Sequence, residues 1–147
     1  MMKIIYLFLL ILLSACNSNV PLNDSATKVD YEEFFQTFFG HFNNHDWEQM
    51  ANMYTQVAEF KDPALGIGAF ERTRAATIAQ YTTLSQMIPD VRDSVVQIYP
   101  SSNKNVIVEF ISMGTAPDGT AFTLPLCAIM KIENGLITRD YVYYDNF

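Results

Sequence analysis

The feature that most constrains this fold is a series of long β-rich segments joined by tight-turn signals. Four segments are rich in β-branched and aromatic residues: residues 91–99, 105–115, 120–133 and 136–145. Pro117-Asp118-Gly119 separates the second from the third, and Asn134-Gly135 separates the third from the fourth. Short turns of this kind connect neighbouring antiparallel strands. The sequence therefore predicts an antiparallel sheet built from consecutive hairpins.

Three helices are predicted ahead of these strands. Asp30 and Glu33 have the spacing of a capping box, and aromatic residues follow them at helical intervals. This aromatic face comprises Tyr31, Phe34, Phe35, Phe38, Phe39 and Phe42. Asp46 can cap a short second helix, and a third helix extends from about residue 71 to 87, ending before Pro89.

Together these elements predict an α+β fold. Three N-terminal helices pack against a strongly curved antiparallel sheet, which forms a cone-like pocket. Residues 55–60 add a brief strand between the second and third helices. Both alternating faces of the segment 120–133 are partly apolar, so one face can cover the core while the other contacts a helix or a second subunit.

The N-terminus predicts a lipid-anchored protein. An apolar run from Ile4 to Leu13 follows Lys3, and it is about half as long as the roughly 20 residues that span a bilayer. The run ends in Leu13-Ser14-Ala15-Cys16, which resembles a bacterial lipoprotein processing site. We therefore expect residues 1–15 to be a signal peptide and Cys16 to be lipidated, with an ordinary secretory signal as the alternative.

The rest of the chain is expected to be a tether and one domain. Residues 16–29 are small and polar, which is typical of a flexible tether, and residues 30–147 have the length and apolar content of a single domain. The predicted location is extracytoplasmic, on a bacterial membrane held through acyl chains.

Composition narrows the classes of function. The formal net charge of −7, with scattered Lys and Arg, argues against nucleic-acid binding. Cys127, His41 and His45 have no metal-ligand spacing, so no metal is expected. The chain also lacks a Gly-rich phosphate loop and a nucleophile set. Any catalysis would therefore be general acid/base chemistry without a cofactor.

The order of elements resembles the nuclear transport factor 2 superfamily. The resemblance rests on residues 53–63, on Asn134-Gly135-Leu136-Ile137 and on Tyr143-Tyr144-Asp145, and it covers residues 30–147. This superfamily includes SnoaL-like polyketide cyclases, ketosteroid isomerases and limonene epoxide hydrolase. The resemblance implies a cystatin-like cone with a pocket for a small apolar molecule. Superfamily members commonly pair through the outer face of the sheet, so a homodimer is expected.

The resemblance also suggests acid/base residues. Asp62 falls on the proton-shuttling position of the ketosteroid isomerases, and Asp145 takes the place of the cyclase acid. The isomerase oxyanion donors are replaced by Phe38 and Cys127, which lack a strong donor. Loss of one such donor commonly costs about 2.7 to 4 kcal/mol, so steroid isomerisation is not expected. Asp62 in a turn and Asp145 at a solvated end are the structural alternatives.

Two functions follow as hypotheses. The first is a domain that binds a small apolar molecule, with no activity assigned. The second is an isomerase, cyclase or dehydratase that uses Asp62 or Asp145 as general acid/base. In either case the predicted ligand-binding residues are Phe38, Phe42, Trp47, Tyr54, Tyr81, Cys127 and Tyr143.

Overall fold

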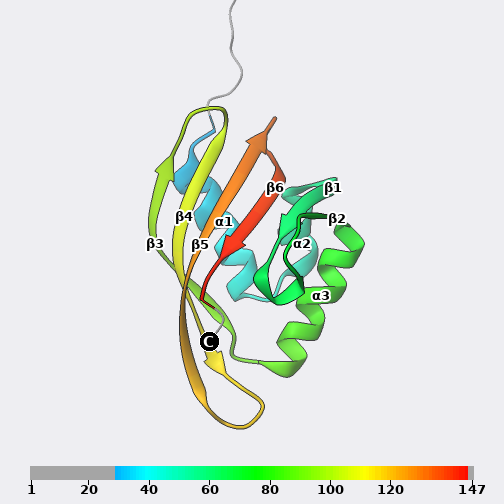
Figure 1. Ribbon diagram of the computed structural model, residues 1–147, viewed down its shortest axis with the longest axis vertical. Coiled ribbons are helices and arrows are strands. Elements are labelled where there is room, and N and C mark those ends of the chain that lie inside the picture. The colour runs from blue at the N-terminus through cyan, green and yellow to red at the C-terminus, as the bar shows by residue number, and fades with distance from the viewer. Residues whose placement is uncertain (1–28, 146–147) are drawn as a thin grey trace, which may run out of the picture.

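The computed structural model describes residues 29–145 and contains one curved sheet with three helices (Figure 1). The predicted lipidation site Cys16, the predicted signal peptide and most of the predicted tether lie outside the described residues. The elements are α1 (Tyr31–Asn43), α2 (Trp47–Asn52), β1 (Tyr54–Lys61), the 3₁₀ turn η1 (Pro63–Leu65), β2 (Phe70–Thr73), α3 (Arg74–Met87), β3 (Arg92–Pro100), β4 (Asn105–Thr115), β5 (Ala121–Glu133) and β6 (Leu136–Tyr143).

The helix boundaries follow from side-chain caps. The Asp30 carboxylate accepts hydrogen bonds from the backbone N–H groups of Glu32 and Glu33 at 3.0 and 3.3 Å, which starts α1. The helix α3 starts at Arg74, where the Thr73 hydroxyl accepts the N–H of Ala76 at 3.2 Å. The sequence placed this start near residue 71. Residues 70–73 instead form the short strand β2, which pairs with β1.

The strand order is β2-β1-β6-β5-β4-β3. The hairpins β4–β5 and β5–β6 form as their turn signals predict, and β3 pairs with β4 in the same antiparallel way. The α+β fold is confirmed, but the sheet is mixed because β1 and β6 run parallel. Turn residues fix only the direction of strands that are neighbours in sequence, and β1 and β6 are separated by six other elements.

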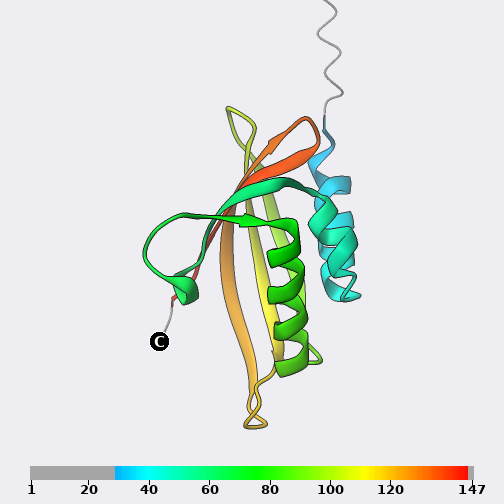
Figure 2. The same cartoon turned by 90° about the vertical axis from the view of Figure 1, so that its right-hand side faces the viewer.

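The helices cover one face of the sheet, here called the inner face (Figure 2). Ala128, Met130 and Ile132 of β5 point into it and are almost fully buried, as their alternation predicts. The aromatic face of α1 packs on these strands, and the ring centroids of Phe39 and Phe110 lie 5.2 Å apart. Val29, placed in the tether by the sequence, packs partly buried against this core.

In residues 29–145, no α-helix covers the opposite, outer face of the sheet (Figure 2). It presents apolar side chains of which Val96 is 57% exposed, Tyr99 46% and Tyr143 38%. Near the ends of β1 and β6, the turn η1 and the C-terminal segment curl over this face (Figure 2). None of the helices in residues 29–145 is long and apolar enough to cross a membrane.

Candidate functional site

A polar pair lies within the aromatic interior, between the inner face and the helices. Asp140 of β6 is 3% exposed and Tyr54 at the start of β1 is 1% exposed. The Tyr54 hydroxyl donates a hydrogen bond to Oδ2 of Asp140 at 2.7 Å. The parallel pairing of β1 with β6 brings these two strands together, with Phe60 opposite Asp140 in the register. The contact between Tyr54 and Asp140 therefore depends on the parallel pairing of β1 with β6, the pairing that makes the sheet mixed.

The pKa of the Asp140 carboxyl lies closer to neutral pH than that of an ordinary carboxyl. Burial raises its pKa from 3.8 to about 6, although the Tyr54 hydrogen bond and the charge of Arg72 both act to lower the pKa. Oδ1 of Asp140 is buried and has no hydrogen-bond partner among the described residues. Burial and the Asp140 charge raise the pKa of Tyr54 well above 10, so Tyr54 remains a donor.

An arginine lies beside this pair. The guanidinium carbon of Arg72, on β2, lies 3.7 Å from the centre of the Phe60 ring. Its Nε donates to the hydroxyl of Thr77 at 3.1 Å, and its Nη1 donates to the amide oxygen of Gln80. In the described part of the chain, Arg72 makes no ion pair within 4.0 Å. Arg72 is therefore a partly buried cation, held by these contacts and without an ion-paired carboxylate among the described residues.

A second buried carboxyl belongs to Asp93 on β3, which is 8% exposed. The Asn43 side chain holds its backbone, accepting the Asp93 N–H at 2.7 Å and donating to the Asp93 carbonyl at 2.8 Å. Burial raises the pKa of Asp93 to about 7, opposed by a hydrogen bond from Ser112. Its Oδ1, like that of Asp140, is buried without a partner in residues 29–145.

Tyr81 of α3 is partly buried against the same core. Burial raises its pKa most, and the charges of Asp140, Arg72, Asp93 and Asp62 also act on its hydroxyl. The indole of Trp47 stacks on the Tyr81 ring with centroids 5.5 Å apart. The interior is thus a packed aromatic core bordered by a few polar groups, a combination of side chains that also occurs in small-molecule sites.

Five of the seven predicted ligand-binding residues meet in this interior. Phe38 lies 5.9 Å from Tyr54, and Phe42 lies 5.4 Å from Trp47 and 5.7 Å from Tyr81, between ring centroids. All except Tyr81 are less than 9% exposed, so they also form the hydrophobic core. These residues therefore pack the hydrophobic core, and any contact with a ligand would be an additional role.

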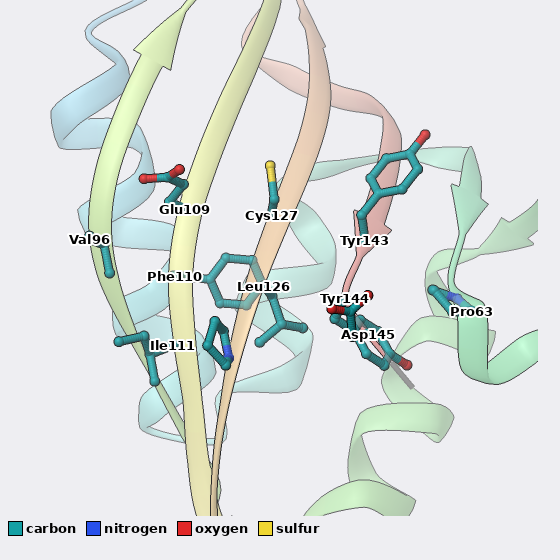
Figure 3. Close-up of a pocket in the computed structure, with 11 residues that line it drawn as sticks. Pro63, Val96, Glu109, Phe110, Ile111, Leu126, Cys127, Tyr143, Tyr144 and Asp145 are labelled. Atoms are coloured by element: carbon teal, nitrogen blue, oxygen red, sulfur yellow. The ribbon is translucent and has the colours of Figure 1, made fainter. Parts of the chain in front are cut away.

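The other predicted residues lie on the outer face, in a groove of about 620 Å³ (Figure 3). Cys127 and Tyr143 come from β5 and β6, and Asp145 is an exposed residue beyond β6. Burial and the nearby charge of Glu109 raise the pKa of the Cys127 thiol. Side chains alternate between the two faces of a strand, but the core residues Phe110 and Leu126 also line this groove, so the groove and the aromatic interior share these two side chains.

Asp62 caps a turn. Its Oδ1 accepts the N–H of Ala64 at 2.9 Å and the hydroxyl of Tyr144 at 2.8 Å, which joins η1 to the C-terminal segment. Burial and this hydrogen bond raise the pKa of Tyr144 to about 12. Both contacts use the same carboxylate oxygen. The Asp62 carboxylate is thus engaged as a structural cap at the edge of the interior, and its charge still reaches Asp140.

The sequence interpretation missed Asp140, Arg72 and Asp93 as site residues. A signal for Asp140 was present, because alternation from Val142 places residue 140 on the inner face of an apolar strand. Arg72 carried no such signal, since it was expected near the start of a helix and lies in a four-residue strand. Within residues 29–145, no group of three or more His, Cys, Asp or Glu side chains could hold a metal ion.

Comparisons with solved structures support this fold. Wild-type IdmH from Streptomyces antibioticus is 17% identical, with a TM-score of 0.69, over 80% of this chain and 94% of that one. A protein of ketosteroid isomerase-like fold from Catenulispora acidiphila, in complex with trimethylamine, is 18% identical, with a TM-score of 0.68, over 77% and 85%. The epoxide hydrolase/cyclase-like enzyme SalBIII of salinomycin pyran ring formation is 20% identical, with a TM-score of 0.67, over 78% and 89%.

The sequence comparisons give the family. No curated protein sequence matches this chain significantly. The model of the SnoaL-like domain matches residues 35–140, a span that runs from the aromatic face of α1 to the buried acid of β6. The neighbours of known structure share the same three helices and curved sheet. By this match, the chain belongs to the SnoaL-like domain family.

Proposed function

We propose that this protein is a membrane-tethered, extracytoplasmic SnoaL-like domain that binds a small apolar molecule between the inner face of its sheet and its helices. The observation that carries the proposal is the buried Oδ1 of Asp140, which has no partner among the described residues and belongs to a carboxyl hydrogen-bonded to the core residue Tyr54. A buried acceptor left unpaired costs about 1 to 3 kcal/mol. A ligand that offers a hydrogen-bond donor there would recover this energy.

The ionised Asp140 carboxylate gives the ligand a fixed orientation. The Tyr54 hydroxyl holds Oδ2, so only Oδ1 is directed to a ligand. The surrounding aromatic side chains supply apolar contact area, as in sites that take drug-sized molecules. This arrangement favours molecules with a rigid ring system and a single polar group.

The pKa of Asp140 favours an enzyme as the second candidate. A carboxyl with a pKa near 6 can take a proton from carbon and return it at neutral pH, as an isomerase, cyclase or dehydratase requires. The burial of Asp140 supports this residue for the role, and Asp62 and Asp145 stay as the alternatives that the sequence suggests. Among the structural neighbours, SalBIII is described as epoxide hydrolase/cyclase-like.

The tether and the oligomeric state are part of the proposal. Leu13-Ser14-Ala15-Cys16 supports lipidation of Cys16 and display outside the cytoplasm. The exposed apolar side chains of the outer face, Val96, Tyr99 and Tyr143, support a homodimer through that face. Sedimentation of the detergent-solubilised chain as a monomer at micromolar concentration would exclude the dimer.

The proposal is tested with 2-naphthol and naphthalene, which differ by one donor. The full chain should bind 2-naphthol about tenfold more tightly, the size expected for a hydrogen bond to a charged acceptor. Binding is measured by equilibrium dialysis against protein-free detergent. In Asp140→Asn the Tyr54 hydroxyl holds the amide oxygen, so the NH₂ group replaces the free acceptor. The preference should disappear.

Two controls separate Asp140 from the acids that the sequence suggested. Asp62→Asn and Asp145→Asn should both keep the preference for 2-naphthol. Protonation of Asp140 should weaken the preference in the wild type below about pH 6. Equal affinity for both probes at pH 8, or loss of the preference in Asp145→Asn alone, would refute the assignment.

The enzyme candidate has its own readout, which is exchange of carbon-bound hydrogen. In deuterium oxide the Asp140 carboxylate would take a proton from C1 of 2-tetralone and return a deuteron to the enolate. The wild type should catalyse this exchange and Asp140→Asn should not, as detected by mass spectrometry. Binding without exchange would leave the ligand-binding function and remove the catalytic one.

A further inference from the structure

The loop between β1 and β2 presents the most exposed large apolar side chain of the described residues. Residues 64–69 read Ala-Leu-Gly-Ile-Gly-Ala, so the loop carries no charged or hydrogen-bonding side chain, and all six residues are exposed. Ile67 is 99% exposed and Leu65 is 50% exposed. The loop extends from the sheet on the side opposite the helices (Figure 2). Consecutive exposed apolar residues mark a contact surface, whereas a single one needs no explanation.

Hydrogen bonds at its base fix where this loop begins. The Asp62 carboxylate caps the turn η1 and also accepts the hydroxyl of Tyr144, and the Asp62 carbonyl accepts the N–H of Leu65 at 3.0 Å. Gly66 then adopts φ +130°, a conformation that other residues rarely take. A Cβ at Gly66 or Gly68 would meet no atom within 4 Å, so open space surrounds the tip. The local structure therefore leaves the apolar side chains of this loop exposed to an external partner.

The length of chain before the described domain lets this loop reach a membrane. Val29 follows the predicted lipidation site Cys16 by 13 residues, which span at most about 45 Å when fully extended. A compact domain of about 120 residues is roughly 35 Å across. Because the reach exceeds this width, any side of the domain can turn towards the bilayer. A tether also raises the effective concentration of the domain at the membrane, so a weak contact suffices.

The chemistry of the loop favours lipid over a protein surface. Protein interfaces form about one hydrogen bond per 100–200 Å², and residues 64–69 offer no side chain for such bonds. The interfacial region of a bilayer accepts apolar side chains, while its headgroups and water satisfy the backbone N–H and C=O groups that hydrocarbon would leave unpaired. The insertion is therefore shallow. Since the formal net charge is −7, the contact does not depend on attraction to anionic headgroups.

We propose that residues 64–69 form a membrane-contact loop, in which Leu65 and Ile67 insert into the interfacial region of the bilayer that holds the lipidated Cys16. The partner is the surface of that bilayer, and neutral lipids are sufficient for the contact. The contact fixes which side of the tethered domain faces the membrane. This is the side on which Pro63, at the base of the loop, borders the groove of Figure 3. The inference rests on the proposed function, because it requires the lipid anchor.

Photolabelling by lipid tests this contact in the full, lipidated chain. The chain is reconstituted in phosphatidylcholine vesicles that include a phosphatidylcholine with a diazirine in its acyl chain, close to the headgroup. After illumination, mass spectrometry locates the peptides that carry lipid. Residues 64–69 should carry several-fold more lipid than the peptide that contains Met87, which is 52% exposed at the end of α3. High salt should leave this labelling unchanged, because no charge takes part in the contact.

Two matched variants assign the labelling to the loop. Leu65→Ser combined with Ile67→Ser should reduce the labelling of residues 64–69 about tenfold, the change expected when about 55 Å² of apolar contact with the bilayer is lost. Met87→Ser removes an exposed apolar side chain outside the loop and should leave the labelling of residues 64–69 unchanged. Both variants should unfold at the wild-type temperature, since the changed side chains are exposed.

The outcomes separate the loop from the anchor on which it depends. An anchored wild type without lipid label on residues 64–69, or equal label in the double serine variant, would overturn the membrane contact and leave the anchor intact. If the double variant keeps its lipid label but no longer forms the dimer, the loop binds a second copy of the chain, which also overturns the contact. A wild type that carries no fatty acid and does not float with the vesicles would refute the anchor, and this inference would fail with it.

Discussion

At the scale of single residues, Asp93 should make the stability of the fold depend on pH. Its pKa is about 7 in the folded chain and 3.8 as the ordinary value. The folded state therefore holds this proton more tightly, so the stabilisation is full below about pH 3.8 and is lost as the pH rises through 7. Three pKa units correspond to a loss on the order of 4 kcal/mol.

Asp93→Asn tests this dependence, because an amide has the shape of the carboxyl and does not titrate. The free energy of unfolding of the full chain is measured by denaturant titration at pH 4.5 and pH 8. The wild type should lose more stability between these values than the variant does. Asp118→Asn, which changes an exposed turn carboxyl, serves as the control and should behave like the wild type. An equal loss of unfolding free energy between pH 4.5 and pH 8 in the wild type and in Asp93→Asn would contradict a buried, protonated Asp93.

The sequence identified apolar residues of the site better than polar ones. Phe38, Phe42 and Tyr54 stand out because aromatic residues at helical spacing, or at the start of a strand, belong to the interior of any fold. Asp140 could have been found from alternation along β6. Which of Asp62 and Asp140 points into the interior depends on the parallel pairing of β1 with β6. No local sequence pattern encodes that pairing.

At the scale of elements, replacing a glycine by alanine should lower the stability at one position and raise it at another. A Cβ at Gly114 of β4 would lie 2.7 Å from Cγ2 of Ile88 and 3.1 Å from the Phe122 ring. Gly114→Ala should therefore destabilise the chain by about 1 to 3 kcal/mol through overpacking. Gly40 lies within α1, where an added methyl group would meet no atom within 4 Å. Gly40→Ala should stabilise the chain by about 0.5 to 1 kcal/mol.

Thermal unfolding of the full chain measures both changes. Gly68→Ala is the control, since its added methyl also meets nothing within 4 Å and the residue lies in a loop. A Gly114→Ala variant as stable as the wild type would contradict this prediction. It would show that Ile88 can move away at no cost, so that the packing of β4 against the end of α3 does not restrict the side chain at position 114.

Elements were predictable where the signal was local. The cap at Asp30 and the two hairpin turns lie within a few residues of the structure that they specify, and all three form. The strand β2 was missed because its four residues lead directly into α3. Its identity as a strand comes from pairing with β1, and long-range pairing has no signature in a short window.

At the scale of the whole molecule, anchoring should depend on Cys16 and not on the folded domain. We expect Cys16→Ser to remain folded, to release the protein from membranes and to stop incorporation of labelled fatty acid. Fractionation and fatty-acid labelling measure these effects, with Cys127→Ser as the matched control that keeps both. A Cys16→Ser chain that still carries label and sediments with membranes would refute the lipid anchor.

The parallel pair of β1 and β6 also determines the order in which the molecule can assemble during synthesis. The strand β1 emerges early with only the short β2 as a partner, and its second neighbour is the last strand of the chain. Local hairpins form quickly, whereas a contact across most of the sequence closes a large loop and comes late. The Tyr54–Asp140 pair therefore forms only after the ribosome has released all the elements from β1 to β6. During synthesis, the growing polypeptide would therefore contain Tyr54 but not the assembled Tyr54–Asp140 pair.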